Sequence, residues 1–348
     1  MKKLKRLLIV LAAMVMATAA MFGCGETPSA DYTNPIAIYM PDGAPALAFA
    51  KLMDEENKLG KDNGVTYTVF PAQGEGSASD KFLADKPTMA VLPITDVSLF
   101  LNDDNYKDYR IVSILTHGNL FLIGKEQITT LSDLKGKRVS VVNIDKVPGL
   151  TFKYLLGKNG INYNGEGDSV TLNGIVGTQV AGVIKTNKAD FVLVPQPAAA
   201  VAKAALKQNF DITVNTFNVN ECYSESGFPQ AVLVAKKELC DDTNFLKKLE
   251  TALKENAEWI KEEENGKAKN AEKAVNAVTE HFADDATTTL DAGKLPLDAI
   301  KGSNIYYQSV NDSTTRSFVK DYINNMIAIE ASAAKAITDD YFYRVKFE

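Results

Sequence analysis

The residue types that most often carry enzymatic chemistry are few in this chain, and their spacing does not suit such chemistry. There are only two histidines, His117 and His281, and neither has a second histidine or a cysteine at metal-ligand spacing. The G-x-S-x-G turn that usually presents a hydrolase serine does not occur. Cysteine catalysis would have to combine Cys222 or Cys240 with His117, without any local signature. The sequence therefore predicts no catalytic residue and no metal site.

Motifs for nucleotides and calcium are also incomplete. The run at residues 74–79 begins like G-x-G-x-x-G but lacks the third glycine, and Glu75 within it would repel a pyrophosphate. The acidic run at residues 102–105 lacks the glycine and the distal glutamate of a calcium loop, so it is better interpreted as a polar turn. We therefore expect no cofactor.

Loops that suit binding without chemistry remain, and the first of them lies within residues 36–53. Alternating apolar residues at 36–40 predict a strand, Pro41, Asp42 and Gly43 predict a tight loop, and the following residues predict a helix with one buried face. Free backbone N–H groups at such a helix start can hold ligand oxygens. A plain connection between strand and helix has the same pattern, so both interpretations stay open.

Strands and helices must position these loops, and the sequence alternates between the two. Strands are expected at residues 65–70, 89–92, 111–115, 121–123, 139–142, 170–172, 191–194, 212–217 and 231–235. Helical patterns lie between them, and from residue 243 the chain changes to amphipathic helices. Alternation of this kind is typical of parallel sheets covered by helices. Two successive units predict two lobes with a cleft between them, followed by a helical C-terminal part.

The N-terminus is typical of an exported lipoprotein. Basic residues precede an apolar run at residues 7–22, which is shorter than the roughly 20 residues of a membrane span and suits a signal peptide. The run ends at Cys24 in a segment that looks like a lipobox, although Met21 and Phe22 replace its usual residues. We expect a signal peptide at residues 1–23, lipid on Cys24 and a tether at residues 24–33. The alternative is a secreted protein whose Cys24 is incidental.

Charge and cysteine content add two further expectations. The chain carries 38 Lys+Arg and 44 Asp+Glu, a formal net charge of −6 at pH 7. Because nucleic-acid binding requires a basic face, we expect no nucleic-acid partner. Cys222 and Cys240 could form a disulfide in an oxidising compartment or remain two buried thiols. Their spacing does not decide between these alternatives.

Three stretches resemble one known family. They are Ile-Tyr-Met-Pro-Asp-Gly-Ala-Pro-Ala-Leu at 38–47, Leu-Ser-Asp-Leu-Lys-Gly-Lys-Arg-Val-Ser-Val-Val at 131–142, and Lys-Ala-Asp-Phe-Val-Leu-Val-Pro-Gln-Pro at 188–197. Together they resemble the substrate-binding lipoproteins of bacterial ABC importers, in the nitrate/sulfonate/taurine/thiamine-precursor group with the type II periplasmic-binding fold. The third stretch departs from the family pattern at Lys188, where glycine is usual, and at Gln196, where an acidic or variable residue is usual.

The resemblance implies an α/β fold of two lobes with a ligand cleft between them. Lobe 1 would combine residues 34–125 with 227–348, and lobe 2 would span residues 126–222. It also implies that a monomer, anchored by lipid to the extracytoplasmic face of the cell membrane, closes on a small organic solute. The partners would be an ABC permease and its ATPase. A surface lipoprotein that binds a protein or polymer, and an enzyme on this fold such as a pyrimidine-precursor synthase, are the alternatives.

The ligand-binding residues are predicted from their positions at expected strand ends and helix starts. They are Tyr39, Asp42, Gly43, Ala44, Gln73, Gly74, Ser77, Thr95, Asn119, Asn143, Pro148, Gly149, Thr178, Gln179, Gln196 and Tyr223. Tyr39 could stack on a ligand ring or lie in the core, and Asp42 could bind a ligand amine or cap the helix. Helix starts favour an anion, but the loops hold few cations besides Lys146. This balance favours a neutral or nitrogen-containing solute, such as a thiamine-like pyrimidine.

Overall fold

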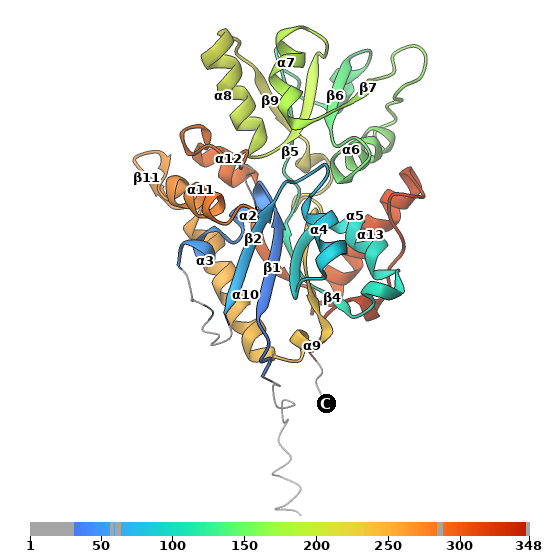
Figure 1. Ribbon diagram of the computed structural model, residues 1–348. Coiled ribbons are helices and arrows are strands. Elements are labelled where there is room, and N and C mark those ends of the chain that lie inside the picture. Colours follow the sequence, from blue (N-terminus) through green and yellow to red (C-terminus); the bar gives the residue numbers. More distant parts are fainter. Residues whose placement is uncertain (1–30, 56–58, 60–63, 284–287, 346–348) are drawn as a thin grey trace, which may run out of the picture.

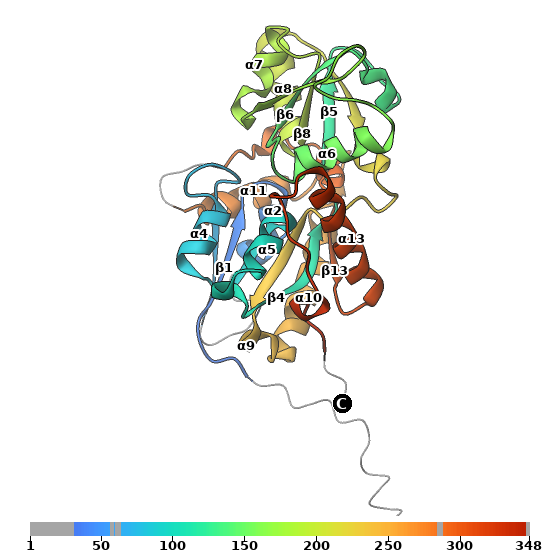
Figure 2. The ribbon, with the colours of Figure 1, turned by 90° about the vertical axis from the view of Figure 1, so that its right-hand side faces the viewer.

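The computed structural model describes residues 31–55, 59, 64–283 and 288–345. These residues form two lobes, one above the other in Figures 1 and 2, and each lobe is built on its own sheet. The expected signal peptide and Cys24 lie outside the described residues, as does most of the expected tether. In the described part of the chain, no helix is long and apolar enough to cross a membrane.

Lobe 1 contains a six-stranded mixed sheet in the order β13-β4-β10-β3-β1-β2. Its strands are β1 (Ile36–Pro41), β2 (Val65–Phe70), β3 (Met89–Pro93), β4 (Tyr109–Thr116), β10 (Ala231–Lys236) and β13 (Ile305–Ser309). The first three strands are parallel, and β10 runs antiparallel to both β3 and β4. β13 adds an antiparallel edge strand beside β4.

Lobe 2 contains a five-stranded sheet in the order β7-β6-β8-β5-β9. Its strands are β5 (Leu120–Gly124), β6 (Arg138–Val142), β7 (Thr171–Ile175), β8 (Phe191–Pro195) and β9 (Asn215–Asn218). β6 is parallel to β7 and β8, and β5 is antiparallel to β8 and β9. Each lobe has three parallel strands and one antiparallel strand beside them, which is β10 in lobe 1 and β5 in lobe 2. In each lobe this antiparallel strand comes directly after the chain has crossed from the other lobe.

Helices cover both faces of each sheet. On lobe 1, α4 (Ala78–Asp85), α5 (Ile94–Leu101) and α13 (Ser313–Ile329) bury one face, and α2 (Ala44–Leu47), α3 (Ala50–Asp54), α10 (Thr243–Trp259) and α11 (Ala271–Glu280) bury the other. On lobe 2, α6 (Val147–Lys158) covers one face, and α7 (Val180–Lys185) and α8 (Ala198–Phe210) cover the other. The short helices α9 (Lys237–Cys240) and α12 (Leu297–Gly302), and the hairpin of β11 (Glu263–Glu264) and β12 (Lys267–Ala268), complete lobe 1.

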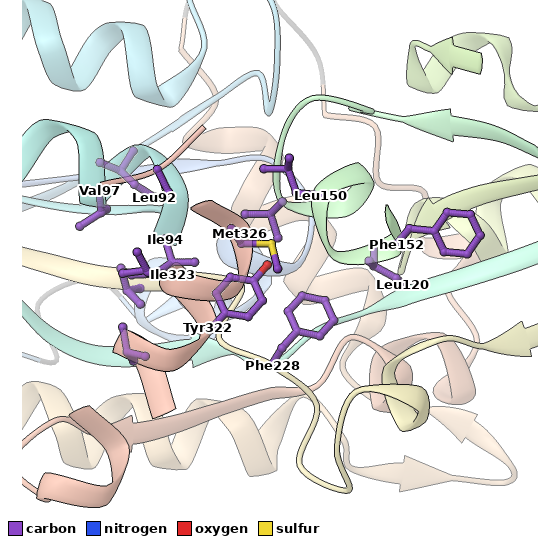
Figure 3. Packing of buried hydrophobic residues seen from close by; sticks show 14 of the residues in the cluster. Leu92, Ile94, Val97, Leu120, Leu150, Phe152, Phe228, Tyr322, Ile323 and Met326 are labelled. Carbon is purple, nitrogen blue, oxygen red and sulfur yellow. The ribbon is translucent and has the colours of Figure 1, made fainter. Parts of the chain in front are cut away.

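One apolar cluster runs from lobe 1 into lobe 2. Figure 3 shows Leu92 and Ile323 of lobe 1 in the same cluster as Leu150 and Phe152 of lobe 2. Each fully buried side chain of this size contributes about 1.5–3 kcal/mol relative to an exposed one. The cluster therefore holds α6 against α13, and the lobes are in contact on this side of the molecule.

Three elements differ from the sequence-based expectation. The sheets are mixed rather than parallel, because the chain returns between lobes and inserts β10 and β5 in the opposite direction. β5 lies in the lobe 2 sheet, so the first crossing is at residues 117–119 and not at the expected boundary after residue 125. β13 was not expected, since its five residues stand among amphipathic helices.

Local boundaries also differ. The single helix expected after Gly43 is divided into α2 and α3, with Phe49 between helical turns. α5 begins at Ile94, directly after Pro93, and no side chain caps its start. The cysteine alternatives are decided in favour of free thiols, because Cys222 and Cys240 are not bonded to each other.

Candidate functional site

The two crossings between the lobes lie side by side and are joined by hydrogen bonds. Phe228 N donates to the carbonyl oxygen of His117 at 3.2 Å, and Gln230 N donates to that of Thr116 at 3.0 Å. Asn119 N donates to Gln230 Oε1 at 3.0 Å. The crossings therefore form one two-stranded, hydrogen-bonded connection between the lobes.

Two glycines allow this close approach. Gly227 has φ of +75°, and a Cβ on it would lie 1.9 Å from the carbonyl oxygen of His117. Gly118 has φ of +78°, and its Cβ would meet the Phe228 ring at 2.5 Å. Any side chain at either position would push the two crossings apart.

His117 is a buried part of this connection rather than a reactive group. Its ring stacks on Tyr306 with centroids 3.5 Å apart, and its Nε2 lies 2.8 Å from Gln308 Oε1. Gln308 donates its own amide to Thr315, so the Oε1 accepts and His117 Nε2 carries the proton. Burial lowers the pKa of His117 to about 4, so the imidazole is neutral at pH 7.

A pocket of about 370 Å³ lies between the lobes. It is lined by Gln73 from the β2–α4 connection of lobe 1, and by Asn143, Ile144, Asp145, Lys146, Gly174, Ile175, Val176 and Gln179 of lobe 2. Val176 stands out because it is 49% exposed, an unusual state for a large apolar side chain. The volume suits a small organic molecule, and the lining combines amides, backbone groups and apolar side chains.

An ion pair joins the lobes at the edge of this pocket. Lys146 Nζ of lobe 2 lies 2.9 Å from Asp96 Oδ1 of lobe 1, and Ser79 Oγ donates to Asp96 Oδ2 at 2.8 Å. The Asp96 side chain is only 7% exposed, whereas Lys146 is 58% exposed. The positive charge of Lys146 is thus already compensated by a carboxylate of the opposite lobe.

Three of the predicted binding residues, Gln73, Asn143 and Gln179, line the pocket together. Gly74 and Ser77 belong to the same connection as Gln73, and Ser77 caps α4 by accepting from Asp80 N. Thr178 is in the 3-10 turn that contains Gln179.

Pro148 and Gly149 are buried in the first turn of α6 and do not line the pocket. A Cβ on Gly149 would lie 1.9 Å from the carbonyl oxygen of Ile144. Gly149 therefore lets the loop that carries Asn143 and Lys146 fold tightly onto the helix start.

Asp42 and the start of α2 are used in packing. The Asp42 carboxylate accepts from Thr288 Oγ1 at 2.6 Å, and from Thr289 N and Oγ1 at 2.7 Å each. It therefore neither caps α2 nor remains open to a ligand amine. Gly43 precedes α2 with φ of +95°, and Ala44 is buried inside it. Neither lines the pocket.

Tyr39 and Tyr223 also have internal partners. The Tyr39 ring lies 4.8 Å from that of Phe70, and its hydroxyl donates to Asp85 at 3.2 Å. Tyr223 packs among Tyr154, Phe228 and Tyr322 beside the crossings, and burial raises its pKa to about 12. Both residues support the lobes rather than line the pocket.

Asn119 and Gln196 join the first crossing to lobe 2. Asn119 Nδ2 donates to the carbonyl oxygen of Gln196 at 2.5 Å, and Gln196 N donates to that of Asn119 at 2.7 Å. The Gln196 Oε1 accepts from Ala200 N at the start of α8. Thr95, at the start of α5, is buried with 1% exposure.

The sequence-based prediction missed some of the pocket lining. Gly174, Ile175 and Val176 were missed because β7 was expected to end at residue 172, short of the end that lines the pocket. Ile144 and Asp145 follow Asn143 directly, and the position after β6 was the signal that could have found them. Asp96 was not among the predicted binding residues, and its carboxylate bonds Lys146 across the lobes.

The fold and the position of the pocket define a class of protein. Two α/β lobes of matching strand order, joined by two adjacent crossings, are the type II periplasmic-binding fold. A family model described as NMT1/THI5 like matches residues 60–265. This is more than half of the chain, which therefore belongs to the NMT1/THI5-like family. No curated protein matches the chain in a sequence comparison.

Several solved structures share the fold over most of their length. An ABC transporter protein from Parabacteroides distasonis is 16% identical with a TM-score of 0.66, covering 89% of this chain and 99% of its own. The periplasmic aliphatic sulphonate-binding protein SsuA from Escherichia coli is 11% identical with a TM-score of 0.63, covering 91% and 93%. The alkanesulfonate-binding protein SsuA from Xanthomonas axonopodis pv. citri, bound to MOPS, is 12% identical with a TM-score of 0.59, covering 90% and 100%.

Proposed function

We propose that this protein is an extracytoplasmic solute-binding lipoprotein that captures a small organic solute between its lobes and delivers it to an ABC permease and its ATPase. The observation that carries the proposal is a pocket lined by residues of both lobes, in a fold whose lobes are joined by two hydrogen-bonded crossings. Membership of the NMT1/THI5-like family supports it. The structural relatives named above, which are described as transport or binding proteins, also support it.

Capture would proceed by closure of the lobes over the solute. The Lys146–Asp96 ion pair and the contact of α6 with α13 join the two lobes, so separation of the lobes would break the ion pair. A solute that touches both Gln73 and the lobe 2 lining adds affinity for the closed arrangement alone. Its binding therefore shifts the population toward closure, and a permease can distinguish the closed protein from the open one.

Binding fits the described residues better than catalysis does. His117 has its Nε2 engaged by Gln308 and its ring buried under Tyr306, so it has no access to a solute. Burial raises the pKa of both Cys222 and Cys240, which keeps their thiols protonated and weakly nucleophilic at pH 7. The described residues include no group of three or more His, Cys, Asp or Glu side chains that could hold a metal ion.

The lipid anchor is a separate part of the proposal. It rests on the apolar segment and Cys24, and it would place a monomer on the extracytoplasmic face of the cell membrane. Substitution Cys24→Ser should move the protein from the membrane fraction to the soluble exported fraction. Retention of the variant in the membrane fraction would contradict the anchor.

The function is tested by finding the solute. Freshly purified protein is denatured, released small molecules are identified by mass spectrometry, and each candidate is returned to the protein in a thermal-shift assay. We expect one small molecule to raise the melting temperature, because ligand that binds only the folded state stabilises it. A protein that binds a partner protein or polymer instead would release no small molecule, and turnover of the candidate would favour the enzyme.

A further inference from the structure

We propose that Ile144 is a specificity-determining residue of the pocket, where its side chain forms a fixed apolar wall that limits the size of the solute. This inference rests on the proposed function and adds what restricts the solutes that the pocket accepts. It is carried by one residue with left-handed backbone and two closely packed glycines, which together hold Ile144 in place.

The loop between β6 and α6 turns sharply at the residue before Ile144. This residue, Asn143, follows β6 directly and has φ of +59°, in the left-handed region that asparagine enters more readily than most residues. Its carbonyl oxygen accepts from Lys146 N at 3.1 Å and from Gly149 N at 3.3 Å. The loop is therefore closed onto the start of α6, with the backbone of Ile144 inside it.

Two glycines enclose Ile144 from different sides. Gly149 lies against its backbone, because a Cβ on Gly149 would lie 1.9 Å from the carbonyl oxygen of Ile144. Gly174 of β7 lies against its side chain, because a Cβ there would lie 2.8 Å from Ile144 Cγ2. The φ of Gly174 is outside the left-handed region, so the close approach of Ile144, and not the local backbone, requires a glycine at this position.

The enclosed side chain faces the pocket. Ile144 is half-buried, packs against the apolar cluster that runs between the lobes, and also lines the pocket. Ile175 and Val176, which follow Gly174 in the chain, continue the apolar part of the lining. A side chain packed between two backbones cannot shift without a collision, so Ile144 cannot move aside for a larger solute.

Substitution Ile144→Ala tests the wall, because it removes the side chain beyond Cβ. The probes are the molecule that copurifies with the wild-type protein and an analogue of it extended by two carbon atoms at its apolar end. We expect the affinity of the variant for the copurified molecule to fall, and its preference to shift toward the longer analogue by about tenfold or more. Ile144→Val should shift the preference in the same direction by less. Ile212→Ala, on the opposite face of lobe 2, is the control and should leave the preference unchanged.

Substitution Gly174→Ala tests the enclosure. Its methyl group would collide with Ile144 Cγ2 and displace the wall, so the affinity for the copurified molecule should fall by about tenfold. Ile144→Ala removes Cγ2, so Gly174→Ala should have little further effect in that background. The control is Gly182→Ala, because Gly182 lies in α7 outside the pocket with no atom near its Cβ position.

Isothermal titration of both probes into the wild type and the variants gives the result. A shift of preference in Ile144→Ala, and a loss in Gly174→Ala that is absent from the double variant, support the inference. An unchanged preference in Ile144→Ala and Ile144→Val overturns it and leaves the proposed function intact. Equal losses from Gly174→Ala in both backgrounds also overturn it, because the added methyl group would then act on the solute directly. If no molecule copurifies with the protein or binds to it, the proposed function fails together with the inference.

Discussion

The ion pair between Lys146 and Asp96 gives the sharpest prediction about closure. It joins the two lobes at 2.9 Å, and its carboxylate is further held by Ser79. Substitution Lys146→Met removes the charge but keeps a long side chain, and Asp96→Asn removes the opposite charge with little change of shape. Either change should favour the open arrangement, because the pair cannot form when the lobes separate.

The size of the effect follows from the distance and the exposure. Two charges 2.9 Å apart attract by about 6 kcal/mol at an effective dielectric constant near 20, and by about 1.4 kcal/mol in water. Lys146 is 58% exposed, so the net value lies near the lower figure, at about 1–2 kcal/mol. This corresponds to a loss of about 5–30-fold in the closure equilibrium and in solute affinity.

The assay is a double-mutant cycle on the solute dissociation rate. Each single variant should accelerate dissociation, and the double variant should be no worse than the stronger single variant. High salt should weaken the difference. Lys207→Met is the control, because its ion pair with Asp211 lies within lobe 2. Additive effects in the cycle, or an equal effect of Lys207→Met, would refute the idea that the pair links the lobes.

Three further predictions concern the hinge and the contact between lobes. Because burial lowers the pKa of His117 to about 4, its neutral form stabilises the fold fully above pH 6.5, and about 3 kcal/mol should be lost as the pH falls from 6.5 to 4. Urea unfolding across this range should show a shallower pH dependence for His117→Asn, and an unchanged slope would contradict the prediction. Gly227→Ala should lower the unfolding free energy by more than about 2 kcal/mol, because a Cβ at this position would meet the other crossing. The control Gly266→Ala should cost about 1 kcal/mol, since Gly266 shares a positive φ but has open space around it. Equal losses in the two variants would argue against contact between the crossings. Tyr322→Phe removes the 2.7 Å hydrogen bond to Thr151 between α13 and α6 and should cost about 1 kcal/mol in thermal unfolding; no loss would mean that this bond does not hold the lobes together.

Much of the fold could be predicted from local patterns in the sequence. Alternating strands and helices indicated two α/β lobes, and short apolar runs such as residues 191–194 marked most strands within a few residues. The direction of β10 and the placement of β5 in lobe 2 could not be predicted. They depend on how the chain crosses between lobes, which no local period records.

The residues at strand ends could be predicted from the sequence, whereas their tertiary partners could not. Gln73, Asn143 and Gln179 follow strands and do line the pocket. Asp42 is also at a strand end, but a distant segment at Thr288 and Thr289 occupies its carboxylate. Thr288 is 246 residues after Asp42 in the chain, and local sequence cannot reveal a partner that far away.

The central claim is that one small solute binds between the lobes and brings them together. Small-angle scattering of the purified protein, recorded without and with saturating amounts of the copurified molecule, tests it most directly. The account predicts a smaller radius of gyration on saturation and, in native mass spectrometry, one molecule bound per chain. Scattering curves that coincide while a molecule is bound, or a stoichiometry other than one, would contradict it.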